Sequence, residues 1–102
     1  MKMGERELEE FSGAYILSHP VRAAIVRLLR KEKTAYTSQI AKALGFSERL
    51  VSFHLSMLLR AKFVESEYRL TNPVTSPPRV ARYYRLTPKV DDTLSKFVDA
   101  LK

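Results

Sequence analysis

Residues 37–61 of this chain contain two helical patterns with almost no chain between them. Hydroxyl groups that can cap a helix are supplied by residues 36–39, and the apolar spacing that follows predicts a helix of barely two turns. Gly45 is expected to end it, because glycine adopts the left-handed conformation of a helix C-terminus without strain. Ser47 then has the place of the N-cap of a second helix, which runs to about residue 61. The pattern therefore predicts two helices joined by a tight turn.

Three further helices are predicted from apolar spacing. The first covers about residues 5–17, the second begins at Pro20, which suits the first turn of a helix, and the last covers about residues 88–101. On the second helix the apolar residues follow the i, i+3, i+4 pattern, and its arginines, Arg22 among them, fall outside this stripe. The arginines of the second helix are therefore expected off its apolar face.

Two strands are predicted between the helix pair and the last helix. Residues 64–70 alternate apolar and hydroxyl side chains with charged ones, and residues 80–86 are rich in valine and tyrosine. The segment 71–78 holds three prolines, which cannot donate to a strand ladder, so an extended loop at a hairpin tip is expected. This order of elements is that of a winged helix-turn-helix, mainly α with a small β-hairpin, in a single domain over residues 1–102 with a wing over about 64–87.

Charge is distributed unevenly along the chain. The chain has 18 Lys and Arg against 11 Asp and Glu, a net charge of +7. Residues 1–18 carry a net −2 and residues 90–102 a net −1, whereas residues 19–89 carry 14 Lys and Arg against four Glu, a net +10. The basic section coincides with the helix pair and the wing, which favours an anionic partner there.

The second helix of the pair has one apolar and one polar side. Val51, Leu55 and Leu58 project to one side, with His54 beside them, and are expected to pack inward. A B-form major groove accepts one helix, and arginine, serine and an aromatic ring can contact base edges, phosphates and a thymine methyl. The candidate DNA contacts on and before this helix are Ser47, Arg49, Ser52, Phe53, Ser56 and Arg60. The alternative is that the arginines are ordinary solvated surface and the phenylalanine packs on a neighbouring helix.

Two further groups are candidate phosphate contacts. Thr37, Ser38 and Gln39 open the first helix of the pair, where free backbone N–H groups and the helix dipole attract phosphate, although the same hydroxyls can cap the helix. Arg79 and Arg82 lie on the wing, which can follow the backbone or enter the minor groove. The alternative for the wing is that Arg82 or Arg85 pairs with Glu65 or Glu67 across the hairpin, a contribution of roughly 0.2–1 kcal/mol.

Four segments in this order and spacing resemble the ArsR-type winged-helix transcriptional regulators. They are LSHPVR at residues 17–22, AKALGFS at 41–47, VSFHL at 51–55 and YYRL at 83–86. The resemblance implies a recognition helix that holds Ser52 and a homodimer built on the first and last helices. Apolar stripes on those two helices support the second point; the candidate interface residues are Leu8, Phe11, Tyr15, Leu94, Phe97, Val98 and Leu101. The alternative is that each stripe completes the core of its own monomer.

No metal, cofactor or catalytic residue is expected. Many ArsR-type sensors bind metal through a cysteine pair, at positions where this chain has Tyr36 and Ser38, and others through Asp and His on the last helix, which here has no histidine. The two histidines are too far apart in sequence for a local ligand pair; His19 is expected to help start a helix and His54 to be packed or hydrogen-bonded. No nucleophile–base pair or glycine-rich phosphate loop is present, which disfavours an enzyme.

The sequence therefore predicts a cytoplasmic, homodimeric regulator that binds double-stranded DNA at a palindromic operator, with repression as the expected sign. No membrane association is expected, because no apolar run is long enough to span a bilayer. The alternative is a winged-helix interaction module, or a subunit of a larger complex, whose basic face binds an acidic protein. Binding to RNA or single strands would require more exposed aromatic residues than the sequence offers.

Overall fold

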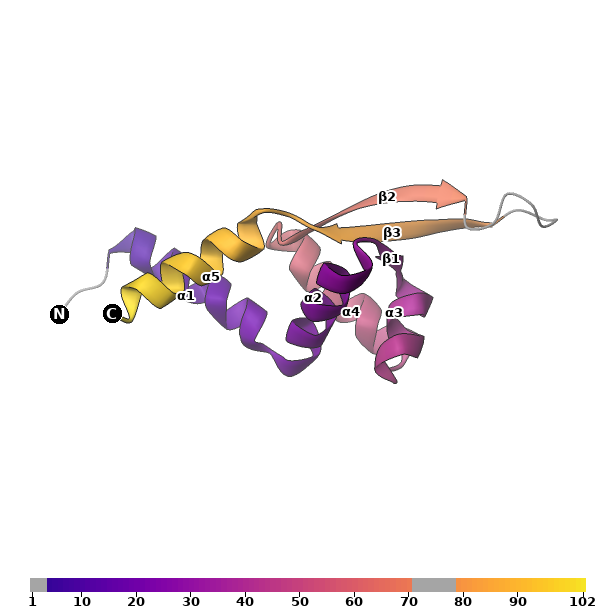
Figure 1. Ribbon diagram of the computed structural model, residues 1–102, viewed down its shortest axis with the longest axis horizontal. Helices are drawn as coiled ribbons and strands as arrows, with labels where there is room; N and C mark the ends of the chain where they lie inside the picture. Colours follow the sequence, from indigo (N-terminus) through magenta and orange to yellow (C-terminus); the bar gives the residue numbers. More distant parts are fainter. Residues whose placement is uncertain (1–3, 71–78) are drawn as a thin grey trace.

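The computed structural model describes residues 4–70 and 79–102, and the predicted proline-rich loop of residues 71–78 lies outside them (Figure 1). The described residues form five helices and three strands in the predicted winged helix-turn-helix order. The elements are α1 (Glu5–Ser18), α2 (Pro20–Glu32), β1 (Ala35–Tyr36), α3 (Thr37–Leu44), α4 (Glu48–Arg60), β2 (Val64–Leu70), β3 (Val80–Leu86) and α5 (Lys89–Ala100). None of the helices described has the length and apolarity needed to cross a bilayer.

The turn between α3 and α4 confirms the expected chemistry. Gly45 has φ 74° and ψ 27°, the left-handed conformation that a side chain would strain. The backbone N–H of Phe46 donates to the carbonyl of Ala41 at 3.0 Å, which closes the end of α3. The Ser47 hydroxyl then accepts from the backbone N–H of Leu50 at 3.1 Å and caps α4. These contacts fix the angle between the two helices.

The start of α3 differs from the prediction of a hydroxyl cap. Tyr36 is the N-cap residue, and its backbone N–H donates to the Gln39 side-chain oxygen at 3.1 Å. Among the described residues, the hydroxyls of Thr37 and Ser38 make no hydrogen bond. The amide of Gln39 therefore does the capping, and the two hydroxyls stay available.

The core lies where α2, α3 and α4 meet the sheet. Its fully buried side chains are Ile25 and Leu29 of α2, Ile40 of α3, Val51, Leu55 and Leu58 of α4, and Phe63, which follows α4. The predicted inward side of α4 is confirmed, His54 included. Burial of one such apolar side chain contributes about 1.5–3 kcal/mol, so this cluster holds the helix pair in place.

The three strands form one antiparallel sheet in the order β1-β3-β2. β2 pairs with β3 from Val64↔Leu86 to Leu70↔Val80, as the two predicted strands require. The sequence did not predict β1, which pairs Ala35 with Tyr84. A strand of two residues has no periodicity to detect, so only the tertiary contact with β3 defines it.

The molecule is elongated, because two pairs of elements project from the core in opposite directions. Its extents are 61 × 23 × 20 Å, and its radius of gyration of 15.7 Å exceeds the roughly 13 Å of a compact domain of this length. The β2–β3 hairpin extends at one end, and α1 and α5 lie side by side at the other (Figure 1). Gly13 permits their close approach, since a Cβ there would lie 2.9 Å from Thr93 Cγ2.

Candidate nucleic-acid interface

The outward side of α4 is polar and exposed over its whole length. The residues predicted to contact DNA from this side, Arg49, Ser52, Phe53, Ser56 and Arg60, are all exposed. Among the described residues, neither Arg49 nor Arg60 forms an ion pair. The Ser56 hydroxyl donates to the carbonyl of Phe53 at 2.7 Å, whereas Ser52 makes no such bond in the described chain. Two guanidinium groups and the Ser52 hydroxyl are therefore free to donate outward.

Phe53 does not pack on a neighbouring helix, which was the alternative for this residue. Its side chain is 58% exposed. The ring lies edge-on to the ring of His54, the next residue on the same helix, with centroids 5.1 Å apart. Most of the phenylalanine face is thus open to contact with an apolar group on a ligand, such as a methyl group.

A buried polar cluster fixes the rotation of α4 against α2. The Arg22 Nε donates to His54 Nδ1 at 3.2 Å, and its Nη1 donates to the carbonyl of Ile16 at 3.0 Å. Arg22 is only 8% exposed, so its expected place outside the inward side of α2 is wrong. A buried guanidinium persists only where it is hydrogen-bonded, and these two bonds tie α1, α2 and α4 together.

The two histidines meet in this cluster, although they lie far apart in sequence. Their ring centroids are 4.4 Å apart. His19 Nδ1 also accepts from the backbone N–H of Val21 at 3.2 Å, which confirms its expected role at the start of α2. In the described part of the chain, no group of three or more His, Cys, Asp or Glu side chains is placed to hold a metal ion.

The environment of His54 favours its neutral form. Burial is the largest cause of the lowered pKa of His54, and the positive charges of His19 and Arg22 lower it further. The neutral ring carries its proton on Nε2, because Nδ1 accepts from Arg22. The recognition-helix candidate is thus anchored through an uncharged imidazole.

The two faces of the β2–β3 hairpin carry different chemistry, because neighbouring residues of a strand point to opposite sides. On one face, Arg85 Nε pairs with Glu65 at 2.7 Å and Arg85 Nη1 with Glu67 at 3.5 Å, while Arg69 pairs with the same Glu67 at 2.9 Å. The cross-strand pairing considered for this hairpin is therefore correct for Arg85. Two carboxylates balance two guanidinium groups, so this face has little attraction for phosphate.

The other face of the hairpin holds Arg82 without a carboxylate. Its Nε donates to the Ser66 hydroxyl at 2.7 Å, and the guanidinium lies 5.7 Å and 5.4 Å from the ring centroids of Tyr68 and Tyr84. Pairing of Arg82 with Glu65 or Glu67 is therefore wrong. Cation–π contacts hold the guanidinium beside the two rings and leave its Nη protons to donate elsewhere. Arg79 is exposed, directly before β3.

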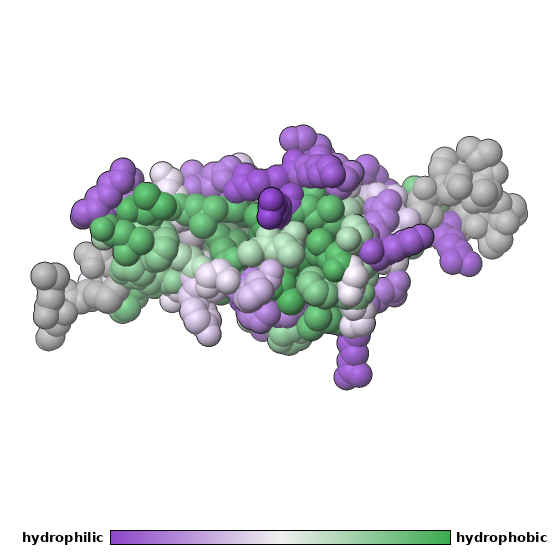
Figure 2. Space-filling model, turned by 60° about the horizontal axis from the view of Figure 1, so that its bottom comes forward, coloured by the Kyte–Doolittle hydropathy of each residue, from purple (hydrophilic) through white to green (hydrophobic). Residues whose placement is uncertain are grey.

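Helices α1 and α5 expose much of the apolar stripe that was predicted for a dimer. Phe11 and Phe97 are half-buried against each other, with ring centroids 5.5 Å apart. The remaining candidates are exposed: Leu8, Tyr15, Leu94, Val98 and Leu101. Figure 2 shows hydrophobic surface over this end of the molecule. Of the seven candidate interface residues, only Phe11 and Phe97 are therefore half-buried within the monomer.

One basic residue beside the helix pair was not among the predicted contacts. Lys42 is exposed on α3 and lines the same hollow as Ser38 and Phe46. Its position in the section of net positive charge could have indicated that it lies near an anionic partner. Sequence reasoning passed over it because it follows the capping residues by a full turn.

Comparison with protein families gives a match, which includes the α3–α4 helix pair. Residues 17–67 match the family described as helix-turn-helix domain. Comparison with curated proteins gives no significant match.

Several solved structures have the same fold. The transcriptional repressor PagR of Bacillus anthracis is 25% identical, with a TM-score of 0.67 over 92% of this chain and 99% of that one. A possible transcriptional regulator for arsenical resistance is 24% identical, with a TM-score of 0.68 over 87% and 82%. A transcriptional regulator homologue from Pyrococcus horikoshii OT3 is 24% identical, with a TM-score of 0.62 over 95% and 98%. The chain belongs to the helix-turn-helix domain family, and its fold is that of the winged-helix regulators it was found to resemble.

Proposed function

We propose that this chain is a transcriptional regulator that binds double-stranded DNA sequence-specifically by placing α4 in the major groove. The observation that carries the proposal is the exposed polar side of α4, which lies opposite a completely buried side. A helix of this kind fits the width of a B-form major groove. Sequence is read best by side chains on a rigid support, and the Arg22–His54 bond supplies that support.

Arg49 and Ser52 are the proposed base-reading residues. Both are exposed in the first half of α4, and neither is held by another side chain in the part of the chain described. A guanidinium can donate two hydrogen bonds to a guanine edge, and a hydroxyl can bond several bases. Phe53 is placed to touch a thymine methyl, while Ser56 and Arg60 follow one and two turns further along the helix.

Phosphate contacts are proposed on either side of α4. Ser47 and the free hydroxyls of Thr37 and Ser38 lie at helix starts, where phosphate is favoured, and Gln39 can add its amide N–H₂. On the hairpin, Arg79 and Arg82 are proposed to contact the backbone beside the reading helix, Arg82 through its Nη groups. Such contacts set register and affinity without reading sequence.

We further propose a homodimer that joins through α1 and α5 and acts on a palindromic operator, most simply as a repressor. The exposed apolar residues of these helices support the dimer, since a second copy would bury them. Two-fold symmetry would place two α4 helices in major grooves about one helical turn or a multiple apart. Repression is proposed because one protein of similar fold is named a transcriptional repressor.

Selection of binding sites from random duplex DNA tests the reading helix. We expect an enriched, imperfectly palindromic site that the wild type prefers. The double variant Arg49→Ala/Ser52→Ala should lose this preference by about 2–6 kcal/mol in total, since each good base contact is worth about 1–3 kcal/mol, and should keep much of its nonspecific binding.

Arg30→Ala is the matched control, because Arg30 pairs with Asp91 of α5 at 2.5 Å on a different surface. Its site preference should equal that of the wild type. If the double variant keeps the preference, α4 is not the reading helix. If the wild type does not bind random duplex even at low salt, the chain is an interaction module whose basic face binds an acidic protein.

A further inference from the structure

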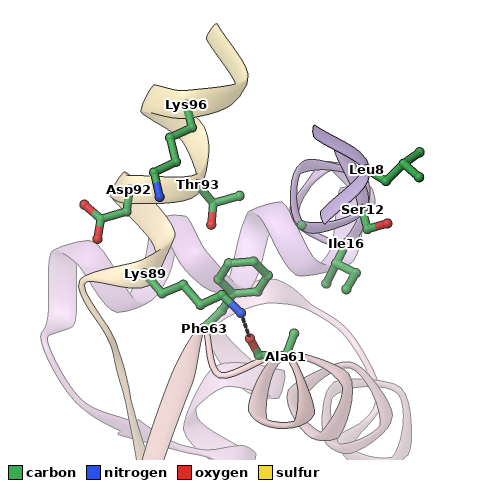
Figure 3. Close-up of a pocket in the computed structure, with 10 residues that line it drawn as sticks. Leu8, Ser12, Ile16, Ala61, Phe63, Lys89, Asp92, Thr93 and Lys96 are labelled. Atoms are coloured by element: carbon green, nitrogen blue, oxygen red, sulfur yellow. Dashed lines mark hydrogen bonds between the residues drawn. The ribbon is translucent and has the colours of Figure 1, made fainter. Parts of the chain in front are cut away.

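A groove between α1, α5 and the turn after α4 contains none of the residues proposed to contact DNA. α1, α5 and the turn between α4 and β2 line this open groove, which has a volume of about 670 Å³ (Figure 3). This volume is within the roughly 300–1,000 Å³ of small-molecule sites. The groove is therefore large enough for a ligand of several carbon atoms.

One side of the groove is apolar. Ile16 of α1 and Ala61 at the end of α4 are half-buried, and the ring of Phe63 closes the floor. Figure 3 shows Ile16 across from Asp92, Thr93 and Lys96 of α5, with Phe63 beside Lys89. An apolar body placed here would displace water from surface that the chain leaves partly exposed.

The opposite side of the groove presents donors from one stripe of α5. Lys89, Thr93 and Lys96 are spaced i, i+4 and i+7, so they face the same direction. The carboxylate of Asp92 points away from α1 in Figure 3, while the Lys96 side chain runs back along α5 beside Thr93. Among the side chains that the structure describes, the charged residues that line the groove are thus two lysines and one aspartate, a net positive set.

The donors differ in how far the chain already uses them. The Lys89 ammonium donates to the carbonyl of Ala61 at 2.7 Å and lies 5.0 Å from the Phe63 ring centroid, which holds one of its three protons. Thr93 is buried, and its hydroxyl makes no hydrogen bond to any described residue. The Lys96 ammonium has no carboxylate within ion-pair distance among the described side chains. Several donors that line the groove therefore keep hydrogen-bonding capacity.

We infer that this groove binds a small organic anion, a carboxylate on an apolar body. The carboxylate oxygens would accept from the ammonium groups of Lys89 and Lys96 and from the Thr93 hydroxyl, since charge-assisted hydrogen bonds are the strong ones. The apolar body would lie on Ile16 and Ala61. An inorganic anion would leave the apolar side wet, and an apolar molecule without charge would leave the ammonium groups unused. The inference does not depend on DNA binding.

Titration of the ¹⁵N-labelled chain with sodium octanoate at pH 7.5, below its micelle concentration, tests the site by NMR. Saturable shifts are expected at the backbone amides of Gly13, Phe63 and Thr93. Octan-1-ol and octylammonium, which have the same chain without the negative charge, should bind at least about tenfold more weakly, the equivalent of about 1.4 kcal/mol.

Variants that remove one lysine charge at a time test where the octanoate carboxylate binds. Lys96→Met should weaken octanoate binding about tenfold, the value of one charge-assisted contact, and because Lys96 is exposed the variant should keep the wild-type spectrum elsewhere. Lys89→Met should have a similar effect, and Lys42→Met on α3 is the matched control and should have none. The inference is overturned if octanoate causes no saturable shift, if octan-1-ol binds equally well, if Lys96→Met changes nothing, or if the shifts cluster at Tyr15 and Leu101 instead.

Discussion

Helix α4 and the α1–α5 pair both carry apolar residues at helical spacing, but the two sets lie in different surroundings. The stripe of α4 is covered by α1, α2, α3 and β2, and Val51, Leu55 and Leu58 have no exposed surface. By contrast, Tyr15 on α1 is 76% exposed, and Leu101, directly after α5, is 64% exposed. A single chain therefore completes the surroundings of α4 and leaves those of the terminal helices open. The position of α4, the helix proposed to read DNA, is therefore fixed within one chain. The terminal helices keep exposed apolar surface that a second copy could cover.

The largest expected difference between the two regions is in stability. Leu55→Ala should lower the free energy of unfolding by about 2–5 kcal/mol, because it leaves a cavity beneath α4. Leu101→Ala, the same substitution at an exposed site, should change it by less than about 0.5 kcal/mol at a concentration where the chain is monomeric. Urea unfolding followed by circular dichroism measures both. Similar losses would show that the exposed stripe already supports the monomer.

The proposed dimer is the next test of the contrast. Val98→Glu places a charge on the exposed side of α5 and should raise the dimer dissociation constant about hundredfold, since each of two copies loses about 1.5 kcal/mol of apolar burial. Analytical ultracentrifugation measures the constant. Ser95→Glu is the control, because Ser95 is exposed on the same helix away from the apolar stripe. A monomeric wild type at high concentration would contradict the proposed dimer.

The polar anchor of α4 should contribute less than its apolar side. Arg22→Met keeps the length of the buried stem and removes the bonds to His54 Nδ1 and to the Ile16 carbonyl. Leaving the buried His54 Nδ1 without a donor costs about 1–3 kcal/mol, and the part-buried Ile16 carbonyl can accept from water instead, so the free energy of unfolding should fall by about 1–3 kcal/mol. Hydrogen exchange at α4 amides should rise in parallel. Unchanged exchange would mean that apolar packing alone fixes the helix.

The smallest effect is expected from pH. The lowered pKa of His54 means that the unfolded chain binds its proton more readily than the folded one, so stability is full above the ordinary pKa of about 6.5. As pH falls through that value towards the lower folded pKa, stability should decrease. His19, directly before α2, and Arg22 of α2 are the titratable and charged groups that contact it among the described residues. In His54→Gln the decrease between pH 7.5 and 5.5 should be smaller; an equal decrease would assign it to other groups.

Local sequence rules were sufficient for most of the fold. Gly45 and Ser47 mark the turn of the helix pair because each satisfies backbone groups within its own helix end. Arg22 and His54 could not be paired in advance, because 32 residues separate them and the spacing on α2 placed the arginine outside the stripe. The ion pairs on one face of the hairpin and the cation–π contacts on the other depend on the pairing register of β2 and β3. The alternation of side chains predicts which face a residue lies on, but it does not predict the residue's partner on the next strand.

Because the molecule is elongated, a small rotation of the terminal helices produces a larger displacement at the other end. With a long axis of 61 Å, a rotation of a few degrees at the α1–α5 end displaces the hairpin end by several ångströms. In a dimer joined at that end, the two α4 helices would also move relative to each other, each by less than its hairpin end, while the spacing of DNA grooves stays fixed. A small rotation of one copy against the other, for example on binding of an anion beside α5, would then be enough to prevent both α4 helices from fitting the major grooves at the same time.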